Sequence, residues 1–141
     1  MIRLEAAIDV LVEKGTVDTS GLGTSGNSRK GYQTRYALTH PSKAHLSAAV
    51  ISDALTGFYS KYLFDGSIAN KKALNANYSV NASGSFWDNC DQWLEYETVF
   101  NIDRAQAPVL FSLHGLLIRD MYSPTILEVM GAFRLNDKPM E

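Results

Sequence analysis

The sequence lacks several features that define large classes of protein. Its one cysteine, Cys90, cannot form an internal disulfide framework, and it leaves the redox compartment open. A net charge of −2, with basic residues scattered along the chain, gives no electrostatic basis for binding nucleic acid or an anionic membrane. No apolar run approaches the ~20 residues that a membrane-spanning helix needs. We therefore expect neither a nucleic-acid partner nor a membrane partner.

The N-terminus has no signal-peptide pattern, because charges at Arg3 and Glu5 interrupt any apolar core. We therefore expect a cytoplasmic chain. The 141 residues, 45% of them hydrophobic, correspond to about one globular domain. The histidines have no metal-ligand spacing and no neighbouring cluster of cysteines or carboxylates, so neither a metal nor another cofactor is predicted.

Helical and extended patterns alternate along the chain. The predicted helices cover residues 3–13, 29–40 and 87–97 and a segment that starts at Ser123-Pro124. The predicted strands cover residues 21–25, 46–52 and 108–113, and the tail 138–141 begins another. Residues 65–85, rich in Asn and Ser, are predicted to form a loop excursion. This order predicts the α/β class, with a mostly parallel sheet flanked by helices.

Two of the predicted helices have a recognisable apolar side. In residues 87–97 the aligned positions are Trp87, either Cys90 or Asp91, and Leu94. In the last helix the apolar positions are Ile126, Leu127, Met130 and Phe133. These positions are the expected contacts of the two helices with the rest of the domain.

The segment Leu22-Gly-Thr-Ser-Gly-Asn-Ser-Arg-Lys-Gly-Tyr32 places Ser28 between a predicted strand and a predicted helix. Gly26 lies before the serine and Gly31 after it, which is close to the pattern of a nucleophile elbow. The strict pattern has its second glycine at the position of Lys30. Such a turn aims a hydroxyl at the substrate and puts the next backbone N–H at a helix N-terminus, where developing negative charge is stabilised. A polar turn without catalysis is the alternative.

The stretch Gly26-Asn-Ser-Arg-Lys-Gly-Tyr-Gln-Thr-Arg-Tyr-Ala-Leu-Thr-His40, followed by Ala48-Ala-Val-Ile-Ser-Asp53, resembles the α/β-hydrolase domain of the prolyl oligopeptidase family of serine peptidases. Ala107-Pro-Val-Leu110 resembles the strand that presents the catalytic acid, and Lys138-Pro-Met-Glu141 resembles the edge of the strand before the histidine loop. The elbow is most similar to the lasso-peptide isopeptidase branch. The resemblance implies that residues 1–141 are a partial α/β-hydrolase domain.

The resemblance also implies a Ser–acid–His hydrolase that cleaves peptide or isopeptide bonds, with a peptide as substrate. Ser28 corresponds to the nucleophile, and the backbone N–H of Arg29 to an oxyanion donor. The family spacing for the acid falls on Ile118, so Asp120 is the nearest carboxylate. Glu128 is a poorer candidate because it lies inside a predicted helix.

Asp53 follows the second strand, at the edge of the sheet where ligands bind in open α/β folds. We take it as a candidate for substrate binding, with capping of the next helix as the alternative. His40 is expected to cap the helix that ends before Pro41. His45 lies in a loop, and His114 is the one histidine at the functional edge.

In the family order, the catalytic histidine follows the strand that Met140 begins, beyond Glu141. The second oxyanion donor and the propeller precede residue 1. The resemblance thus implies missing N- and C-terminal segments of the parent domain, and we expect negligible turnover by these residues alone. Two hypotheses stay open: a serine peptidase domain, or a truncated, non-catalytic remnant that acts at most as a binding or dimerising module.

Overall fold

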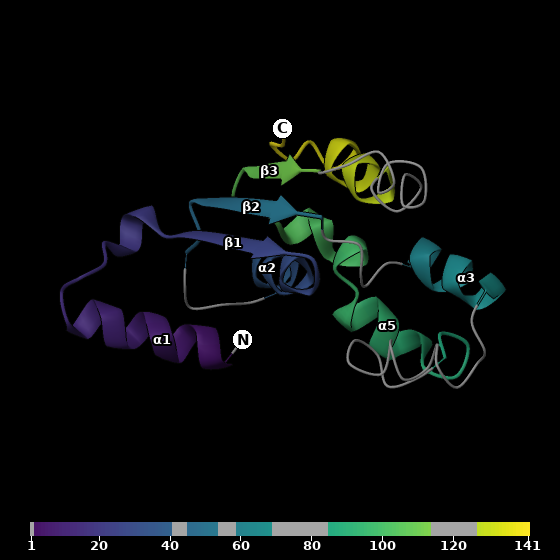
Figure 1. Cartoon of the computed structure of the whole chain (residues 1–141), viewed down its shortest axis with the longest axis horizontal. Coiled ribbons are helices and arrows are strands. Elements are labelled where there is room, and N and C mark those ends of the chain that lie inside the picture. Colours follow the sequence, from purple (N-terminus) through teal and green to yellow (C-terminus); the bar gives the residue numbers. More distant parts are fainter. Residues whose placement is uncertain (1, 41–44, 54–58, 69–84, 114–126) are drawn as a thin grey trace.

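The computed structural model describes residues 2–40, 45–53, 59–68, 85–113 and 127–141. At its centre is a parallel sheet with the strand order β1-β2-β3 (Figure 1). The strands are β1 (Gly23–Asn27), β2 (Ala48–Ser52) and β3 (Val109–Ser112). Both neighbouring pairs run parallel. The α/β class and the parallel sheet predicted from the sequence are therefore confirmed.

The helices are α1 (Ile2–Glu13), α2 (Arg29–Thr39), α3 (Tyr59–Ile68) and α5 (Cys90–Tyr96), with the 3-10 segments η1 (Thr19–Gly21) and η2 (Thr98–Arg104). Of these, α2 packs against β1 and β2, whereas α3 and α5 lie beyond the ends of the strands (Figure 1). Residues 127–135 are also helical. The strand predicted at 21–25 begins at Gly23 instead, because the Asp18 side chain accepts a 2.9 Å hydrogen bond from the N–H of Ser20 and fixes η1 before it.

One face of the sheet forms the core. On this face, Ala49 of β2 pairs with Val109 of β3, and Ile51 pairs with Phe111. The ring of Phe111 contacts Phe133 of the helix 127–135 at 5.5 Å between centroids. The buried residues of this core are Ala37, Leu38, Leu46, Ala49, Ile51, Ile102, Ala105, Ala107, Val109, Val129 and Phe133. The other face is more open, since Leu110 is 47% exposed.

A second cluster joins α3 to α5. Trp93 is fully buried, and its ring lies 4.9 Å from that of Tyr62. The face predicted for residues 87–97 is therefore wrong, because Trp87 is 67% and Leu94 48% exposed. The helix begins only at Cys90, so Trp87 lies in the preceding turn, and the contact with Tyr62 decides which side of α5 is buried.

The last helix buries part of the predicted face, because Phe133 is buried and Met130 half-buried. Leu127 is 63% exposed, whereas Val129 and Phe133, one helical turn apart, are 2% and 0% exposed. The prediction for Phe133 is confirmed and that for Leu127 is wrong. Ile126 and the predicted start at residues 123–124 lie outside the described residues.

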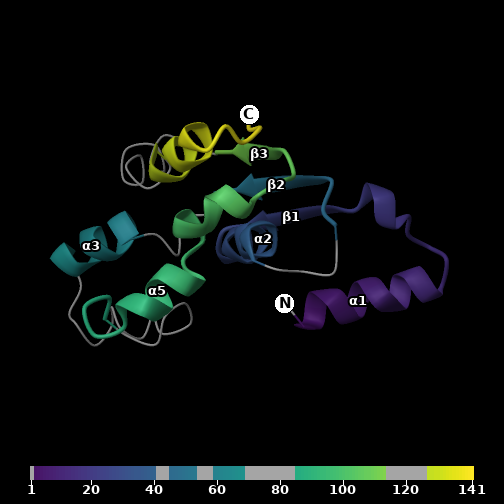
Figure 2. The ribbon, with the colours of Figure 1, turned by 180° about the vertical axis from the view of Figure 1, so that it is seen from behind.

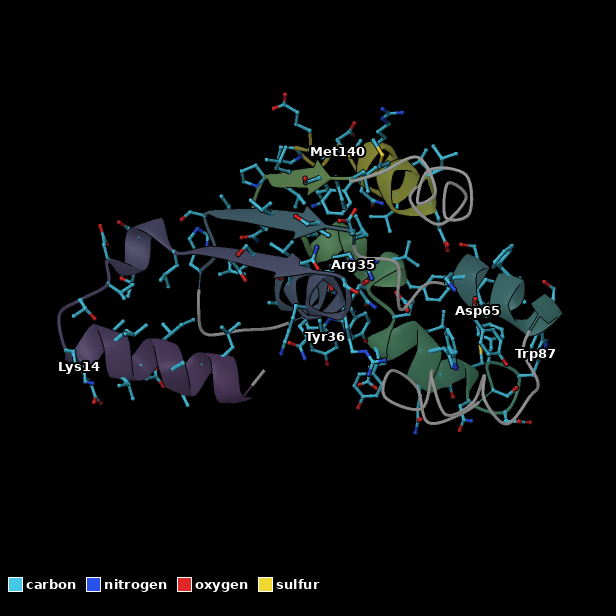
Figure 3. All side chains as sticks on the ribbon, viewed as in Figure 1. Lys14, Arg35, Tyr36, Asp65, Trp87 and Met140 are labelled. Atoms are coloured by element: carbon cyan, nitrogen blue, oxygen red, sulfur yellow. The ribbon has the colours of Figure 1, made fainter. Side chains whose placement is uncertain are left out.

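Two further segments test the predicted boundaries. Residues 65–68 belong to α3 rather than to a loop, while the rest of the predicted excursion up to residue 84 lies outside the described residues. At the C-terminus, Met140 forms a parallel bridge with Val109 (Figure 3). The N–H of Glu141 donates to the Val109 carbonyl at 2.9 Å. The predicted start of another strand in this tail is confirmed.

All strands point toward the side of the molecule where α3 and α5 lie (Figures 1 and 2). The carboxyl ends of β1, β2 and β3 therefore share one edge, and the turn into α2 starts there. In open α/β folds this edge binds ligands.

Candidate active site

Ser28 occupies a strained turn between β1 and α2. Its φ is 52° and its ψ −122°, a conformation that residues with a side chain rarely adopt. Backbone hydrogen bonds hold it there: its N–H donates to the Ser52 carbonyl at 2.9 Å, and the N–H of Gly31 donates to its carbonyl at 3.0 Å. The side chain is exposed and makes no capping hydrogen bond to α2. The turn thus presents the hydroxyl instead of using it as a helix cap.

Gly26 makes this turn sterically possible. A Cβ on Gly26 would lie 2.4 Å from the carbonyl oxygen of Lys30 and 2.6 Å from the Thr34 hydroxyl. Any side chain would therefore clash with the backbone of α2. The Lys30 side chain is exposed, so a lysine in place of the second glycine is accommodated, and Gly31 is buried in the first turn of the helix.

Arg29 is the first residue of α2. Its N–H is therefore one of those that an α-helix leaves without an intrahelical acceptor. This N–H lies directly after Ser28, at the positive end of the helix dipole. The arrangement suits an oxyanion that develops next to the serine.

Asp53 follows β2 and has a φ of 46°. Its N–H donates to the Ser112 carbonyl at 3.0 Å, just as the N–H of Ser28 donates to the Ser52 carbonyl. Both residues therefore directly follow the paired ends of their strands. The Asp53 side chain is half-buried. The structure thus brings Asp53 and Ser28 to the same edge of the sheet on neighbouring strands, whereas Asp120 lies outside the described residues.

The histidines that the structure describes are not at this turn. His40 is the C-cap residue of α2, as predicted, and its N–H donates to the Tyr36 carbonyl. Its ring stacks on Tyr36 at 3.6 Å, and its Nε2 lies 2.7 Å from the Glu95 carbonyl oxygen. His45 is exposed in the loop before β2. His114 lies outside the described residues.

A buried charge cluster that the sequence predictions missed lies between α2 and η2. Arg35 and Glu97 are each 1% exposed. Burial raises the pKa of Glu97 to about 7, although the Arg35 charge opposes this shift. Burial likewise lowers the pKa of Arg35 to about 10, against the effect of Glu97. At neutral pH, Arg35 is therefore a buried cation, and the buried carboxyl group of Glu97 is close to its own pKa.

Glu128 belongs to the same cluster. It lies in the helix 127–135, as predicted, and its Oε2 accepts hydrogen bonds from the N–H and the hydroxyl of Ser60 in α3. Its charge raises the pKa of both Glu97 and Arg35. The one sequence signal for this cluster was the position of Arg35, which lies on the same side of α2 as Gly31 and Leu38.

Within the described part of the chain, no helix is long and apolar enough to cross a membrane. The residues placed in the structure also bring together no group of His, Cys, Asp and Glu side chains that could hold a metal ion.

No family model and no curated protein matches this chain. Solved structures do match. The acylaminoacyl peptidase of Pyrococcus horikoshii aligns over 97% of the chain with a TM-score of 0.68 and 17% identity. A puromycin-hydrolyzing peptidase of Mycobacterium tuberculosis aligns over 96% with a TM-score of 0.69 and 20% identity. Prolyl oligopeptidase B from Galerina marginata aligns over 96% with a TM-score of 0.57 and 16% identity.

The chain spans only about a fifth of these structures: 21% of the first and 19% of each of the others. At such identities the likeness concerns the fold. It covers nearly the whole chain in each case. The chain therefore has part of the α/β-hydrolase fold of peptidases in the prolyl oligopeptidase family, as its sequence resemblance implied.

Proposed function

We propose that this chain is the nucleophile-bearing part of a serine hydrolase domain of the peptidase class. The observation that carries the proposal is the backbone of Ser28, held at a φ of 52° between β1 and α2. Backbone strain in a residue other than glycine persists only where the surrounding structure imposes it, and it collects at functional sites. Here Gly26 and the hydrogen bond to Ser52 impose it.

In the proposed reaction, the Oγ of Ser28 attacks the carbonyl carbon of a peptide or isopeptide bond. The hydroxyl proton passes to a general base, and the amine leaves with a proton as the C–N bond breaks. Water then hydrolyses the acyl ester and regenerates the serine. The N–H of Arg29 stabilises the oxyanion, supported by the N-terminal end of α2.

The other proposed roles belong to the same edge of the sheet. Asp120 is proposed as the acid that orients a histidine, and the resemblance puts that histidine after the strand that Met140 begins. Asp53 is proposed to contact the substrate, because it follows β2 next to the strand that leads to Ser28. A peptide is the proposed substrate.

An activated ester tests the proposed nucleophile. After incubation with p-nitrophenyl acetate and peptide mapping, we expect slow formation of an acetyl group on Ser28, because the good leaving group lets buffer take up the hydroxyl proton while the Arg29 N–H stabilises the oxyanion. Ser28→Ala should lose this adduct. Ser25→Ala, which removes an exposed serine of β1, is the matched control and should keep it. Acetylation without preference for Ser28 would contradict the proposal.

A binding or dimerising module is a second candidate function, and the open face of the sheet favours it. Parallel sheets are usually covered on both faces. Here Leu110, on the face opposite the core, is 47% exposed. Light scattering after size-exclusion chromatography should then show self-association that Leu110→Lys weakens. A chain that stays monomeric at every concentration would argue against dimerisation.

A further inference from the structure

We propose that Arg35 is a positioning residue for the turn at Ser28 and that it acts through the buried carboxyl group of Glu97, with the half-buried Glu128 nearby. This inference rests on the proposed function, because it takes Ser28 as the reactive group. Arg35 lies in α2, the helix that begins directly after Ser28. In Figure 3 it lies inside the molecule, where α2 meets the ribbon that leads toward β3.

Arg35 connects elements that are far apart in the sequence. The helix α2 packs against β1, β2 and η2. Glu97 is the N-cap residue of η2, and its Oε1 accepts a 3.3 Å hydrogen bond from the Val99 N–H. Glu128 lies in the helix 127–135 and is bound to Ser60 of α3. Arg35 of α2 and Glu97 of η2 are thus both buried where these two elements pack together.

Without Arg35, the buried carboxyl group of Glu97 and the half-buried one of Glu128 would remain with no compensating cation from α2. Like charges in a region that excludes water repel strongly, and each charge also loses its hydration. The structure already shows this tension, because both burial and the Glu128 charge raise the pKa of Glu97. The Arg35 guanidinium opposes that shift in the pKa of Glu97.

Tyr32 carries the effect from Arg35 toward Ser28. The Arg35 guanidinium lies 5.8 Å from the centroid of the Tyr32 ring, and the Tyr32 hydroxyl donates to the Tyr96 carbonyl at 3.0 Å. Tyr32 follows Gly31, whose N–H donates to the Ser28 carbonyl at 3.0 Å. A shift of Arg35 would therefore reach the first turn of α2 and the strained serine.

The ionisation of Glu97 gives this role a pH signature. The charged and titratable groups that act on Glu97 are Arg35 and Tyr32 from α2 and Glu128 from the helix 127–135. When Glu97 is protonated, the loss of Arg35 leaves a neutral acid at the buried position. When Glu97 is ionised, the loss of Arg35 leaves a buried negative charge without its cation. The effect of removing Arg35 should therefore be larger above the pKa of Glu97 than below it.

Amide hydrogen exchange on the full chain tests the proposal. Arg35→Met keeps the approximate volume without the charge, and it should lower the protection of the Ser28 and Gly31 amides about tenfold at pH 8 and much less at pH 5. Arg35→Lys, which keeps the charge, should restore most of this protection. Gln33→Ala, at an exposed position of α2, is the matched control and should change nothing.

The double variant Arg35→Met/Glu97→Gln removes one carboxylate together with the cation. We expect it to recover protection at pH 8 relative to Arg35→Met alone, and to fold even if Arg35→Met does not. A loss of protection that is equal at both pH values would overturn the proposal. A double variant that is no better protected than Arg35→Met, or that does not fold, would overturn it as well.

Reaction of Ser28 with a fluorophosphonate separates this proposal from the proposed function. If wild-type Ser28 does not react but the exchange results are as expected, the positioning role stands and the proposed function fails. If Ser28 reacts in the wild type, and Arg35→Met changes neither its labelling nor its protection, the positioning role fails alone.

Discussion

The backbone N–H of Ser28 donates a 2.9 Å hydrogen bond to the carbonyl oxygen of Ser52, the last residue of β2. This bond continues the parallel ladder past the end of β1 and holds the turn by its backbone. An equivalent hydrogen bond lies past the end of β2, where the N–H of Asp53 donates to the Ser112 carbonyl of β3 at 3.0 Å. The conformation of Ser28 is thus set without its side chain, and the exposed hydroxyl can serve in a reaction.

Gly26→Ala should destabilise the chain by about 3 kcal/mol, because the added methyl group meets the Lys30 backbone, which cannot move aside without shifting α2. Urea unfolding measures the effect. Gly23→Ala in the same strand is the control, since its Cβ would lie 3.7 Å from the Ala48 carbonyl oxygen, an ordinary contact. Equal free energies of unfolding for the two variants would show that α2 does not pass Gly26 as closely as described.

Ser28→Gly should be more stable than Ser28→Ala by about 1 kcal/mol, because glycine adopts a positive φ without steric cost. Ser28→Ala itself should unfold close to wild type, since the serine side chain is exposed and caps nothing. The comparison uses the midpoints of urea unfolding. If Ser28→Gly were the less stable variant, the turn would not be strained.

The features predicted correctly from the sequence depend on neighbours along the chain. The glycine spacing around Ser28 predicted the turn, and the apolar run before Asp53 predicted a buried parallel strand. The buried side of α5 depends instead on the contact of Trp93 with Tyr62, a residue from a distant segment. Likewise, nothing near Glu97 in the sequence indicates that it becomes buried beside α2.

The pKa of Glu97 predicts a pH dependence of stability. Its folded-state pKa of about 7 lies above the ordinary 4.5, so the folded chain binds this proton more tightly than the unfolded chain. The contribution of this group to the free energy of unfolding is therefore largest below pH 4.5. It falls by on the order of 2 kcal/mol as the pH rises to about 7.

Glu97→Gln should remove that fall, because the amide stays neutral. Urea unfolding at pH 4.5, 7 and 8 measures the difference between the wild type and the variant, so that contributions of other carboxylates cancel. The two profiles should diverge, with the variant gaining relative stability as the pH rises. Parallel profiles across this range would show that Glu97 is not desolvated.

Asn101→Ala should cost about 2 kcal/mol, because it leaves buried carbonyl groups without a donor. Asn101 is 3% exposed, and its Nδ2 lies 2.9 Å from the carbonyl oxygens of Leu94 and Glu97 at the end of α5. Asp103→Ala, at an exposed position of η2, is the control and should change stability little. A similar cost for both variants would mean that the Asn101 amide does not hold this helix end.

The central claim is that the fold makes Ser28 a nucleophile, and selective labelling by a fluorophosphonate tests it most directly. The native chain and the same chain in urea are treated with the probe, and the adduct is located by peptide mapping. The account predicts an adduct on Ser28 in the native chain that is absent from the unfolded chain and from Ser28→Ala. Labelling that is equal in native and unfolded chains, or a native chain in which Ser28 stays unmodified, would contradict it.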